Sequence, residues 1–249
     1  MCIRDRDNAV NQRVLEAMLH KRGFAVEIAA NGREALTLLS VRSYALVFMD
    51  CQMPEMDGYA ATAAIRGRES GSTRLPIVAM TAHAMKGDRE RCLAAGMDDY
   101  LSKPLRPEEL DEALARVFGG APAADGDAAD AVPLAIDPFE ALVDEARMRV
   151  FRVDYPEIVD QLIELFVEST PPLLSELRES AESGDGEAVH RSAHKLKGSC
   201  QNIGAGFMAK LAADLEVARA ADPAQLDALD RVFEDTRDAL RAALVEDAP

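Results

Sequence analysis

The sequence predicts a doubly wound α/β domain with a parallel sheet, followed by an all-α helical bundle. In the first half, stretches with helical apolar spacing alternate with short, continuous apolar runs typical of buried strands. Residues 119–137 are dominated by Gly, Ala, Pro and Asp, a composition typical of a flexible linker. Beyond this linker the strand signals end, and apolar residues recur only at helical spacing.

The first half contains helical and strand segments in alternation. Apolar residues within 10–19 follow helical spacing until Gly23, and Asn31-Gly32 opens a second helix that ends near Ser40. A last helix is predicted at 110–118. The predicted strands lie at 24–30, 45–49, 76–80 and 100–101. Alternation of this kind predicts parallel strands with helices on both faces of the sheet.

The second half contains only helical patterns. Apolar stripes at 158–166, 189–203, 211–215 and 229–233 predict the helices of a bundle. The pair Pro171-Pro172 lacks two backbone hydrogen-bond donors. We therefore expect these prolines to kink or break the helix that contains them.

Composition argues against several classes of protein. The net charge of −16 argues against a nucleic-acid partner, because phosphate backbones are bound by clustered Lys and Arg. The four cysteines show no paired spacing, which argues against a zinc ribbon or a disulfide framework and suits a reducing cytosol. No apolar run approaches the roughly 18 residues that span a bilayer. We therefore expect a cytoplasmic protein without direct membrane insertion.

Three polar residues follow predicted strands of the sheet. Asp50 follows the strand at 45–49, Thr81 the next strand, and Lys103 the last one, while Asp7 precedes the first helix. The carboxyl ends of parallel strands meet at one edge, so these side chains are expected to converge there. A carboxylate nucleophile, a hydroxyl and an ammonium suit phosphoryl transfer. Asp7 and Asp50 also offer the oxygen ligands that Mg²⁺ prefers.

Four stretches together resemble the bacterial response-regulator receiver domain, over roughly residues 7–118. They are Asp-Asn-Ala-Val-Asn-Gln (7–12), Met-Asp-Cys-Gln-Met-Pro-Glu-Met-Asp-Gly (49–58), Met-Thr-Ala-His-Ala (80–84) and Asp-Tyr-Leu-Ser-Lys-Pro-Leu (99–105). The resemblance implies that Asp50 is the phosphorylated residue and that Asp7 is a metal ligand. It also implies that the carbonyl group of Gln52 is a further Mg²⁺ ligand, and that Thr81 and Lys103 contact the phosphoryl group.

The same resemblance implies two further features near the end of the domain. Tyr100 corresponds to an aromatic switch that turns inward as Thr81 moves, although it also fits a half-buried aromatic at the edge of the sheet. The peptide bond before Pro104 corresponds to a cis peptide in the family. This agrees with the low free-energy cost of the cis isomer at X-Pro bonds, compared with other peptide bonds.

The beginning of the chain departs from the receiver pattern. The family begins with an apolar strand that ends in two adjacent acidic residues, and this strand is central in the 2-1-3-4-5 strand order. Here Arg6 stands where the first acid belongs, and Arg4 interrupts what should be a buried strand. We expect the first strand to be missing or damaged, through a truncation or a misplaced gene start. Its loss would weaken both the receiver fold and Mg²⁺ binding.

The helical half contains a second candidate site around His194. With Ala193 and Leu196 pointing inward, His194 and Lys197 are expected to lie side by side toward the outer face of the helix. An exposed imidazole is a nucleophile near neutral pH, and Lys197 would offset the charge of an acquired phosphoryl group. Gly198 would leave the surface beside His194 bare, so that the active site of another protein can approach.

This second site resembles that of a histidine-containing phosphotransfer (HPt) domain, over roughly residues 138–245. The resemblance rests on Ala-His-Lys-Leu-Lys-Gly-Ser (193–199) with Asn202, Gly204 and Ala205. It implies that His194 is phosphorylated, with Lys197 and Gly198 as supporting neighbours, and His190 is interpreted as a bystander. The predicted organisation is a receiver domain at 1–118, a flexible linker at 119–137 and an HPt bundle at 138–249.

The two resemblances together predict a two-component phosphorelay protein. Asp50 would accept a phosphoryl group from a histidine kinase, and His194 would exchange phosphoryl groups with a receiver aspartate, either Asp50 or one on another response regulator. Both acceptors are expected to be exposed at a surface that a phosphoryl group can reach. Nothing in the sequence resembles an ATP-binding kinase lobe, so ATP-dependent autophosphorylation is not expected.

Two alternatives fit the same motifs. The chain would be the C-terminal part of a hybrid sensor histidine kinase, with its catalytic core upstream, and only then would it be tethered to a membrane. Alternatively, it would be an interaction module that is not phosphorylated, because Arg6 replaces one of the acidic residues of the pocket. The genomic DNA before Met1 and phosphorylation assays distinguish these alternatives.

Overall fold

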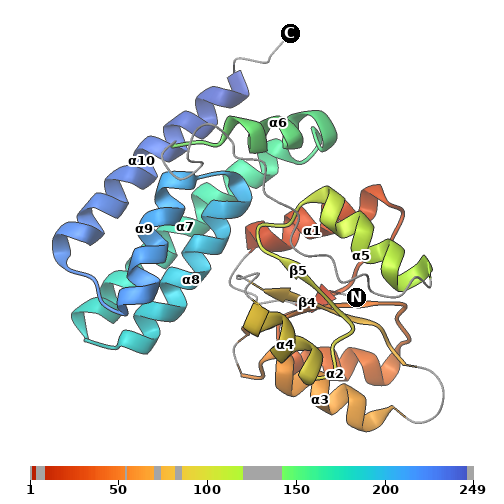
Figure 1. The fold of residues 1–249 in the computed structure, drawn as a ribbon. Coiled ribbons are helices and arrows are strands. Elements are labelled where there is room, and N and C mark those ends of the chain that lie inside the picture. The colour runs from red at the N-terminus through yellow and green to blue at the C-terminus, as the bar shows by residue number, and fades with distance from the viewer. Residues whose placement is uncertain are drawn as a thin grey trace. The chain divides into compact units, whose positions relative to one another are not determined.

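The computed structural model describes residues 2–3, 9–53, 55–69, 74–81, 86–119 and 142–245 of the chain. The chain forms two compact units, an α/β unit and a helical unit (Figure 1). Among these residues, no helix is both long enough and apolar enough to cross a lipid bilayer.

A five-stranded parallel sheet forms the centre of the first unit, with the strand order β2-β1-β3-β4-β5. The strands are β1 (Cys2–Ile3), β2 (Ile28–Ala29), β3 (Val47–Asp50), β4 (Ile77–Thr81) and β5 (Asp99–Ser102). Every neighbouring pair is parallel. The doubly wound parallel sheet predicted from the alternation of elements is therefore confirmed.

The central strand β1 is present only as a short pairing. The sequence predicted a missing or damaged first strand, and Cys2 and Ile3 pair with β2 on one side and with β3 on the other. The strand is only two residues long, and Asp7 lies outside the described residues.

Helices lie on both faces of this sheet (Figure 1). The part of α1 (Ala9–Lys21) from Met18 onward lies with α5 (Pro107–Gly119) on one face. Arg22 joins them, because its guanidinium donates to the carbonyl groups of Met18 (2.8 Å) and Pro107 (3.1 Å) and pairs with Asp111. The other face is covered by α2 (Gly32–Val41), α3 (Gly58–Arg68) and α4 (Lys86–Ala94).

Two helices of this second face begin at side-chain caps. The Asn31 side chain accepts a hydrogen bond from the Glu34 amide (3.0 Å), and that of Asp57 accepts one from the Ala60 amide (2.7 Å). Such caps satisfy amide groups that have no partner within the helix. They also fix where α2 and α3 begin, and hence the short segment from Asp50 to Asp57 that precedes α3.

The core between this face and the sheet is apolar and contains two cysteines. All residues of β3 and β4 are buried, as expected for strands with helices on both faces. The sulfur atoms of Cys51 and Cys92 lie 3.6 Å apart as free thiols. The hydrogen bond between these thiols, together with burial, raises the pKa of Cys51, which therefore stays a neutral thiol that packs in the core.

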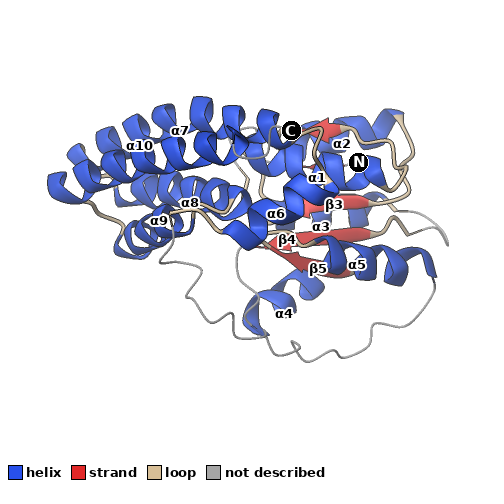
Figure 2. Cartoon of the chain, turned by 90° about the horizontal axis from the view of Figure 1, so that it is seen from above, coloured by secondary structure: helices blue, strands red, loops and turns tan. Residues whose placement is uncertain are grey.

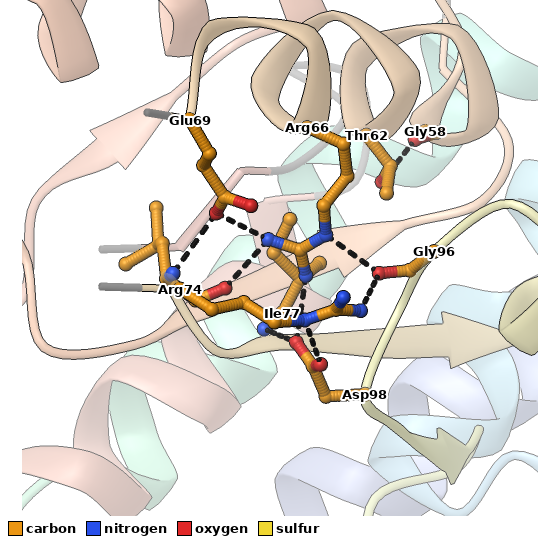
Figure 3. A network of polar contacts seen from close by, with 9 residues as sticks. Gly58, Thr62, Arg66, Glu69, Arg74, Ile77, Gly96 and Asp98 are labelled. Carbon is orange, nitrogen blue, oxygen red and sulfur yellow. Dashed lines mark hydrogen bonds and ion pairs between the residues drawn. The ribbon is translucent and has the colours of Figure 1, made fainter. Parts of the chain in front are cut away.

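A polar network around Arg66 joins α3, β4 and the turn before β5 (Figure 3). The Arg66 guanidinium contacts the carboxylates of Glu69 (2.5 Å) and Asp98 (2.7 Å) and the carbonyl group of Gly96 (2.8 Å). Asp98 in turn accepts a hydrogen bond from the Ile77 amide (2.8 Å) at the start of β4. Because one cation satisfies acceptors from three segments, it fixes the amino-terminal ends of β4 and β5.

Replacement of Arg66 is expected to destabilise the first unit. Arg66→Met leaves partly buried acceptors without their donor, which costs about 2–3 kcal/mol in the free energy of unfolding. Urea denaturation followed by circular dichroism measures this loss. Arg33→Met, on the exposed surface of α2, is the matched control and should change stability by no more than about 0.5 kcal/mol. Equal stability of the two variants contradicts the prediction.

The second unit contains helices without strands in the described range 142–245 (Figure 2). The helices are α6 (Glu145–Asp154), α7 (Val159–Glu182), α8 (Gly186–Ile203), α9 (Gly206–Ala218) and α10 (Pro223–Val245). α8 packs against α7 and α9, and α10 packs against the same two helices. The rings of Phe166 and Phe233 meet in the core at 6.1 Å between centroids. The predicted helical bundle is therefore confirmed.

The prolines of α7 do not break the helix. A kink or break was expected at Pro171 and Pro172; α7 runs through both positions, so the break is wrong and the kink stays a prediction. Both prolines are exposed, and the carbonyl groups that lose their donors belong to Val167, which is half-buried, and Glu168, which is exposed. Buried apolar side chains before and after the prolines anchor the helix to the bundle, which outweighs the two missing hydrogen bonds.

Candidate functional site

The Asp50 carboxylate lies at the carboxyl end of β3, where it meets Lys103 from the segment after β5. The Lys103 ammonium forms an ion pair with Oδ2 of Asp50, and the Gln52 amide donates to Oδ1 (3.2 Å). The side chains of Asp50 and Lys103 are 6% and 7% exposed, respectively. Burial of one such charge without a partner would cost free energy, so the two opposite charges stabilise each other.

Thr81 completes this edge of the sheet. It is the last residue of β4 and is buried, and its carbonyl group accepts a hydrogen bond from the Lys103 amide (2.8 Å). The peptide bond between Lys103 and Pro104 is cis, as the resemblance implied. The structure therefore brings Asp50, Gln52, Thr81 and Lys103 together at the strand ends, as predicted.

Gly58 allows the chain to turn closely over Asp50. A β-carbon at this position would lie 2.2 Å from the backbone oxygen of Asp50, far closer than any side chain tolerates. The Gly58 amide donates to the carbonyl group of Cys51 (3.2 Å) and closes the loop between β3 and α3. Only glycine permits this approach, so Gly58 positions the segment that contains Gln52.

The exposure expected for Asp50 is wrong. Its carboxylate was expected to be open to a phosphoryl donor, but the paired Lys103 covers one of its two oxygens. The physical reason is charge: a lysine within reach of a buried carboxylate binds it directly. A ligand that binds the Lys103 ammonium would therefore have to replace the carboxylate as its partner.

Tyr100 lies in β5, two positions before Ser102. It is half-buried against the α2–α4 face, and the guanidinium of Arg89 lies 5.9 Å from the centre of its ring. This position fits both interpretations, the aromatic switch and the sheet-edge aromatic. The switch stays a prediction, because it concerns a movement.

The second site is centred on a carboxylate that sequence reasoning did not find. His194 of α8 contacts Glu216 of α9, with 2.6 Å between Nδ1 and Oε1, and Lys197 donates from Nζ to Oε2 of the same side chain (2.6 Å). Glu216 is 7% exposed, whereas the His194 side chain is 16% exposed. One carboxylate thus holds the imidazole and the ammonium, one on each oxygen.

The charge state of Glu216 is determined by these two contacts. Burial alone would raise the pKa of this carboxyl group, but the hydrogen bonds from His194 and Lys197 outweigh that effect and lower the pKa to about 2. The carboxylate is therefore ionised at neutral pH and can only accept hydrogen bonds. A neutral His194 must then carry its proton on Nδ1, which leaves the lone pair on Nε2 as the nucleophile.

Two expectations about α8 need correction. Lys197 was expected on the outer face, but it is buried because Glu216 neutralises its charge. His194 is only partly exposed for the same reason, since its ring turns toward Glu216. Gly198 is half-buried on the same helix, four residues after His194. Its predicted role as a bare surface for an approaching partner stays a prediction.

A signal for Glu216 is present in the sequence. Helical spacing places Glu216 beside Ala212 and next to Leu215, both buried, so it is a single acid among buried positions of α9. An acid within an apolar stripe needs a cationic or hydrogen-bonding partner, which α8 supplies. His190 also contacts Glu216, at its main-chain oxygen, and the interpretation of His190 as a bystander omitted this contact.

Both units match known protein domains. Residues 5–115 match the model of the response regulator receiver domain, and residues 161–243 match the model of the Hpt domain. The chain therefore contains a receiver domain followed by an Hpt domain, and these two domains support a role in two-component phosphorelay.

Curated relatives include several histidine kinases. The chain is 43% identical over 114 residues to hybrid signal transduction histidine kinase I of Dictyostelium discoideum, a match that covers 43% of this chain and 7% of that protein. It is 42% identical over 115 residues to the sensor histidine kinase GacS of Pseudomonas protegens, covering 45% and 12%. A match to the signal transduction histidine-protein kinase BarA of Shigella flexneri is 29% identical over 206 residues, covering 82% and 22%. The chain thus spans a small part of each relative.

Solved structures similar to this chain include receiver domains. One is the receiver domain of a sensor histidine kinase of Pseudomonas aeruginosa, which has a magnesium ion coordinated in its active site cleft. It is 47% identical, covers 47% of this chain and 96% of that chain, and has a TM-score of 0.43. Another is a co-crystal of a Saccharomyces cerevisiae histidine phosphotransfer protein with a receiver domain, at 28% identity, 51% and 93% coverage, and a TM-score of 0.44.

The lowered pKa of Glu216 predicts how the stability of the second unit depends on pH. Its ordinary pKa is 4.5 and its folded value is about 2. The stability that Glu216 contributes is therefore present above about pH 4.5 and is lost as the pH falls toward 2. The difference in free energy of unfolding between the wild type and Glu216→Gln should shrink from about pH 6 to about pH 3.

Urea denaturation at each pH measures that difference. The matched control is Glu182→Gln, because this glutamate is exposed at the end of α7. Its difference from the wild type should stay near zero across the range. A difference for Glu216→Gln that does not change with pH contradicts the assigned charge state.

Proposed function

We propose that Asp50 and His194 are the two phosphoryl acceptors of this phosphorelay protein. The observation that carries this proposal is the Lys103–Asp50 ion pair at the strand ends, because it presents a carboxylate nucleophile beside the cation that its product requires. The contact between His194 and Glu216 supports the second acceptor. Both residues also lie in the segments that match the two families.

The proposed reaction at Asp50 is transfer from a phosphohistidine of a histidine kinase. A carboxylate oxygen of Asp50 forms a bond to phosphorus as the phosphorus–nitrogen bond of the donor breaks, and the imidazole of the donor leaves. The phosphorylated side chain then carries a charge of about −1.5 to −2 in place of the single charge of the carboxylate. The Lys103 ammonium and the Thr81 hydroxyl then bind phosphoryl oxygens, which replaces the contact of Lys103 with the carboxylate.

The residues at this site fit a magnesium ion. The carboxylate of Asp50 and the carbonyl group of Gln52 are oxygen ligands of the kind that Mg²⁺ prefers, and the Gln52 amide already fixes their relative position. Asp7 would be the third ligand. When bound, Mg²⁺ would neutralise negative charge on the phosphoryl oxygens.

The proposed reaction at His194 is exchange with an aspartyl phosphate. Nε2 attacks the phosphorus atom, the acyl phosphate bond breaks, and the carboxylate of the donor leaves. Glu216 keeps the proton on Nδ1, so the positive charge that develops on the ring faces an ionised carboxylate. The same reaction in reverse returns the phosphoryl group.

The proposed partners are a histidine kinase, which donates to Asp50, and a receiver domain, which exchanges with His194. That receiver is either the one in this chain or one on another response regulator. We place this exchange in the cytoplasm. The three cysteines in the described part of the chain are free thiols, which supports a reducing compartment.

Phosphorylation of Asp50 is tested with acetyl phosphate and Mg²⁺. The wild-type chain should give a shifted band on a phosphate-affinity gel, and Asp50→Asn should lose it because the nucleophile is absent. Glu112→Gln, which removes an exposed acid from α5, is the control and should shift like the wild type. A full shift in Asp50→Asn removes Asp50 from the mechanism.

Phosphorylation of His194 is tested with phosphoramidate, a small donor that transfers its phosphoryl group to imidazole with loss of ammonia. The experiment uses chains that carry Asp50→Asn, so that only histidine can be labelled. Alkali-stable phosphate should appear on this chain and should disappear when His194→Gln is added. His20→Gln, at an exposed histidine of α1, should leave the label intact. Equal labelling after His194→Gln refutes His194 as the acceptor.

A further inference from the structure

The carboxyl end of α9 has a main-chain oxygen that a histidine of another helix satisfies. Carbonyl groups in the last turn of a helix have no donor within the helix. The Arg219 amide, at the end of α9, satisfies the carbonyl group of Leu215 (2.9 Å). The carbonyl group of Glu216 instead meets Nδ1 of His190, from α8, at 3.0 Å. His190 therefore caps the end of α9.

The hydrogen-bonding role of His190 in this contact is unambiguous. A carbonyl oxygen can only accept, so Nδ1 of His190 must carry a proton and donate it. A histidine at the end of a helix commonly satisfies a terminal carbonyl group in this way. The contact therefore needs a donor at the Nδ1 position, and an apolar side chain of similar size cannot supply one.

Two histidines one helical turn apart thus bind one glutamate. His190 binds the main-chain oxygen of Glu216, and His194 binds its carboxylate. The two rings are nearly parallel, at 27°, and their centroids lie 6.4 Å apart. Lys197 binds the second carboxylate oxygen. Glu216 is held at its backbone by His190 and at its carboxylate by the other two residues.

We propose that His190 is a positioning residue for phosphoryl transfer at His194 and acts through Glu216. By fixing the last turn of α9, it fixes the direction of the Glu216 carboxylate. That carboxylate keeps the proton of His194 on Nδ1 and leaves Nε2 free to attack phosphorus. The inference rests on the proposed function of His194, and it extends that function to a residue that does not touch the phosphoryl group.

A purely structural cap would behave differently from a positioning residue. Loss of a cap lowers the stability of the second unit but leaves the tautomer of His194 unchanged. Loss of a positioning contact lets the carboxylate move, so that part of the His194 population transfers its proton from Nδ1 to Nε2. Only the second effect removes the nucleophilic lone pair, and nitrogen-15 NMR of the imidazoles measures it directly.

The experiment compares two substitutions of His190 in full chains that carry Asp50→Asn. His190→Leu removes the donor, whereas His190→Asn retains an N–H group close to the Nδ1 position. Arg191→Leu, at the exposed neighbouring position, is the matched control. Circular dichroism confirms that each chain is folded. The rate of labelling by phosphoramidate and the fraction of His194 with its proton on Nδ1 are then measured.

His190→Leu should lower the labelling rate by about tenfold, the effect of losing roughly one hydrogen bond, and should lower the Nδ1–H fraction of His194. His190→Asn should restore most of both, and Arg191→Leu should match the parent chain. An unchanged rate in His190→Leu overturns the inference. A lower rate with an unchanged Nδ1–H fraction, or an equal loss in His190→Asn, also overturns it, because the role is then structural.

If His190→Leu does not fold, His190→Asn decides the question, since it must retain the parental rate and tautomer. Failure of the proposed function has a different signature. In that case a chain with His194→Gln is labelled as strongly as the parent chain, whatever residue occupies position 190.

Discussion

A buried charge needs an opposite charge beside it, and this constraint shapes both candidate sites. In the first unit the pair is Asp50 with Lys103, which come from the ends of two different strands. In the second unit Glu216 faces Lys197 and His194, which come from the neighbouring helix. Removal of either partner would leave a charge without compensation in a medium of low polarity. The elements that hold these partners must therefore stay in register.

The two sites prepare their acceptors in different ways. In the proposed mechanism Asp50 is the nucleophile and Lys103 its counter-ion, so that pair would separate when a phosphoryl group arrives. At His194 the counter-ion pair is Lys197 with Glu216, and the proposed nucleophile is Nε2, because Glu216 binds the other ring nitrogen, Nδ1. The first site thus holds Lys103 in place to bind the proposed phosphoryl group, whereas the second fixes the tautomer of His194.

The stabilising contacts of the sheet are separated from its reactive edge. The Arg66 network joins Asp98 to Ile77, at the start of β4, whereas Thr81 ends the same strand beside Lys103. The carboxyl ends of the strands can then carry residues chosen for chemistry, because the other ends hold the register. Gly58 is the exception, since it serves the fold by letting the chain pass close to the reactive residue Asp50.

The sequence by itself determined the class of each unit and the strands β3 to β5, because periodicity is visible within short segments. Local motifs also indicated Asp50, Lys103 and His194 as candidate site residues. The sequence did not predict α3 and α4, whose small or polar residues give little amphipathic contrast, nor the continuity of α7 through its prolines. Only the tertiary structure decided that Glu216 binds His194 and that His190 holds Glu216. Those contacts join α8 to α9. Which side chains of two helices come into contact depends on how the helices pack, and no local sequence pattern encodes that packing.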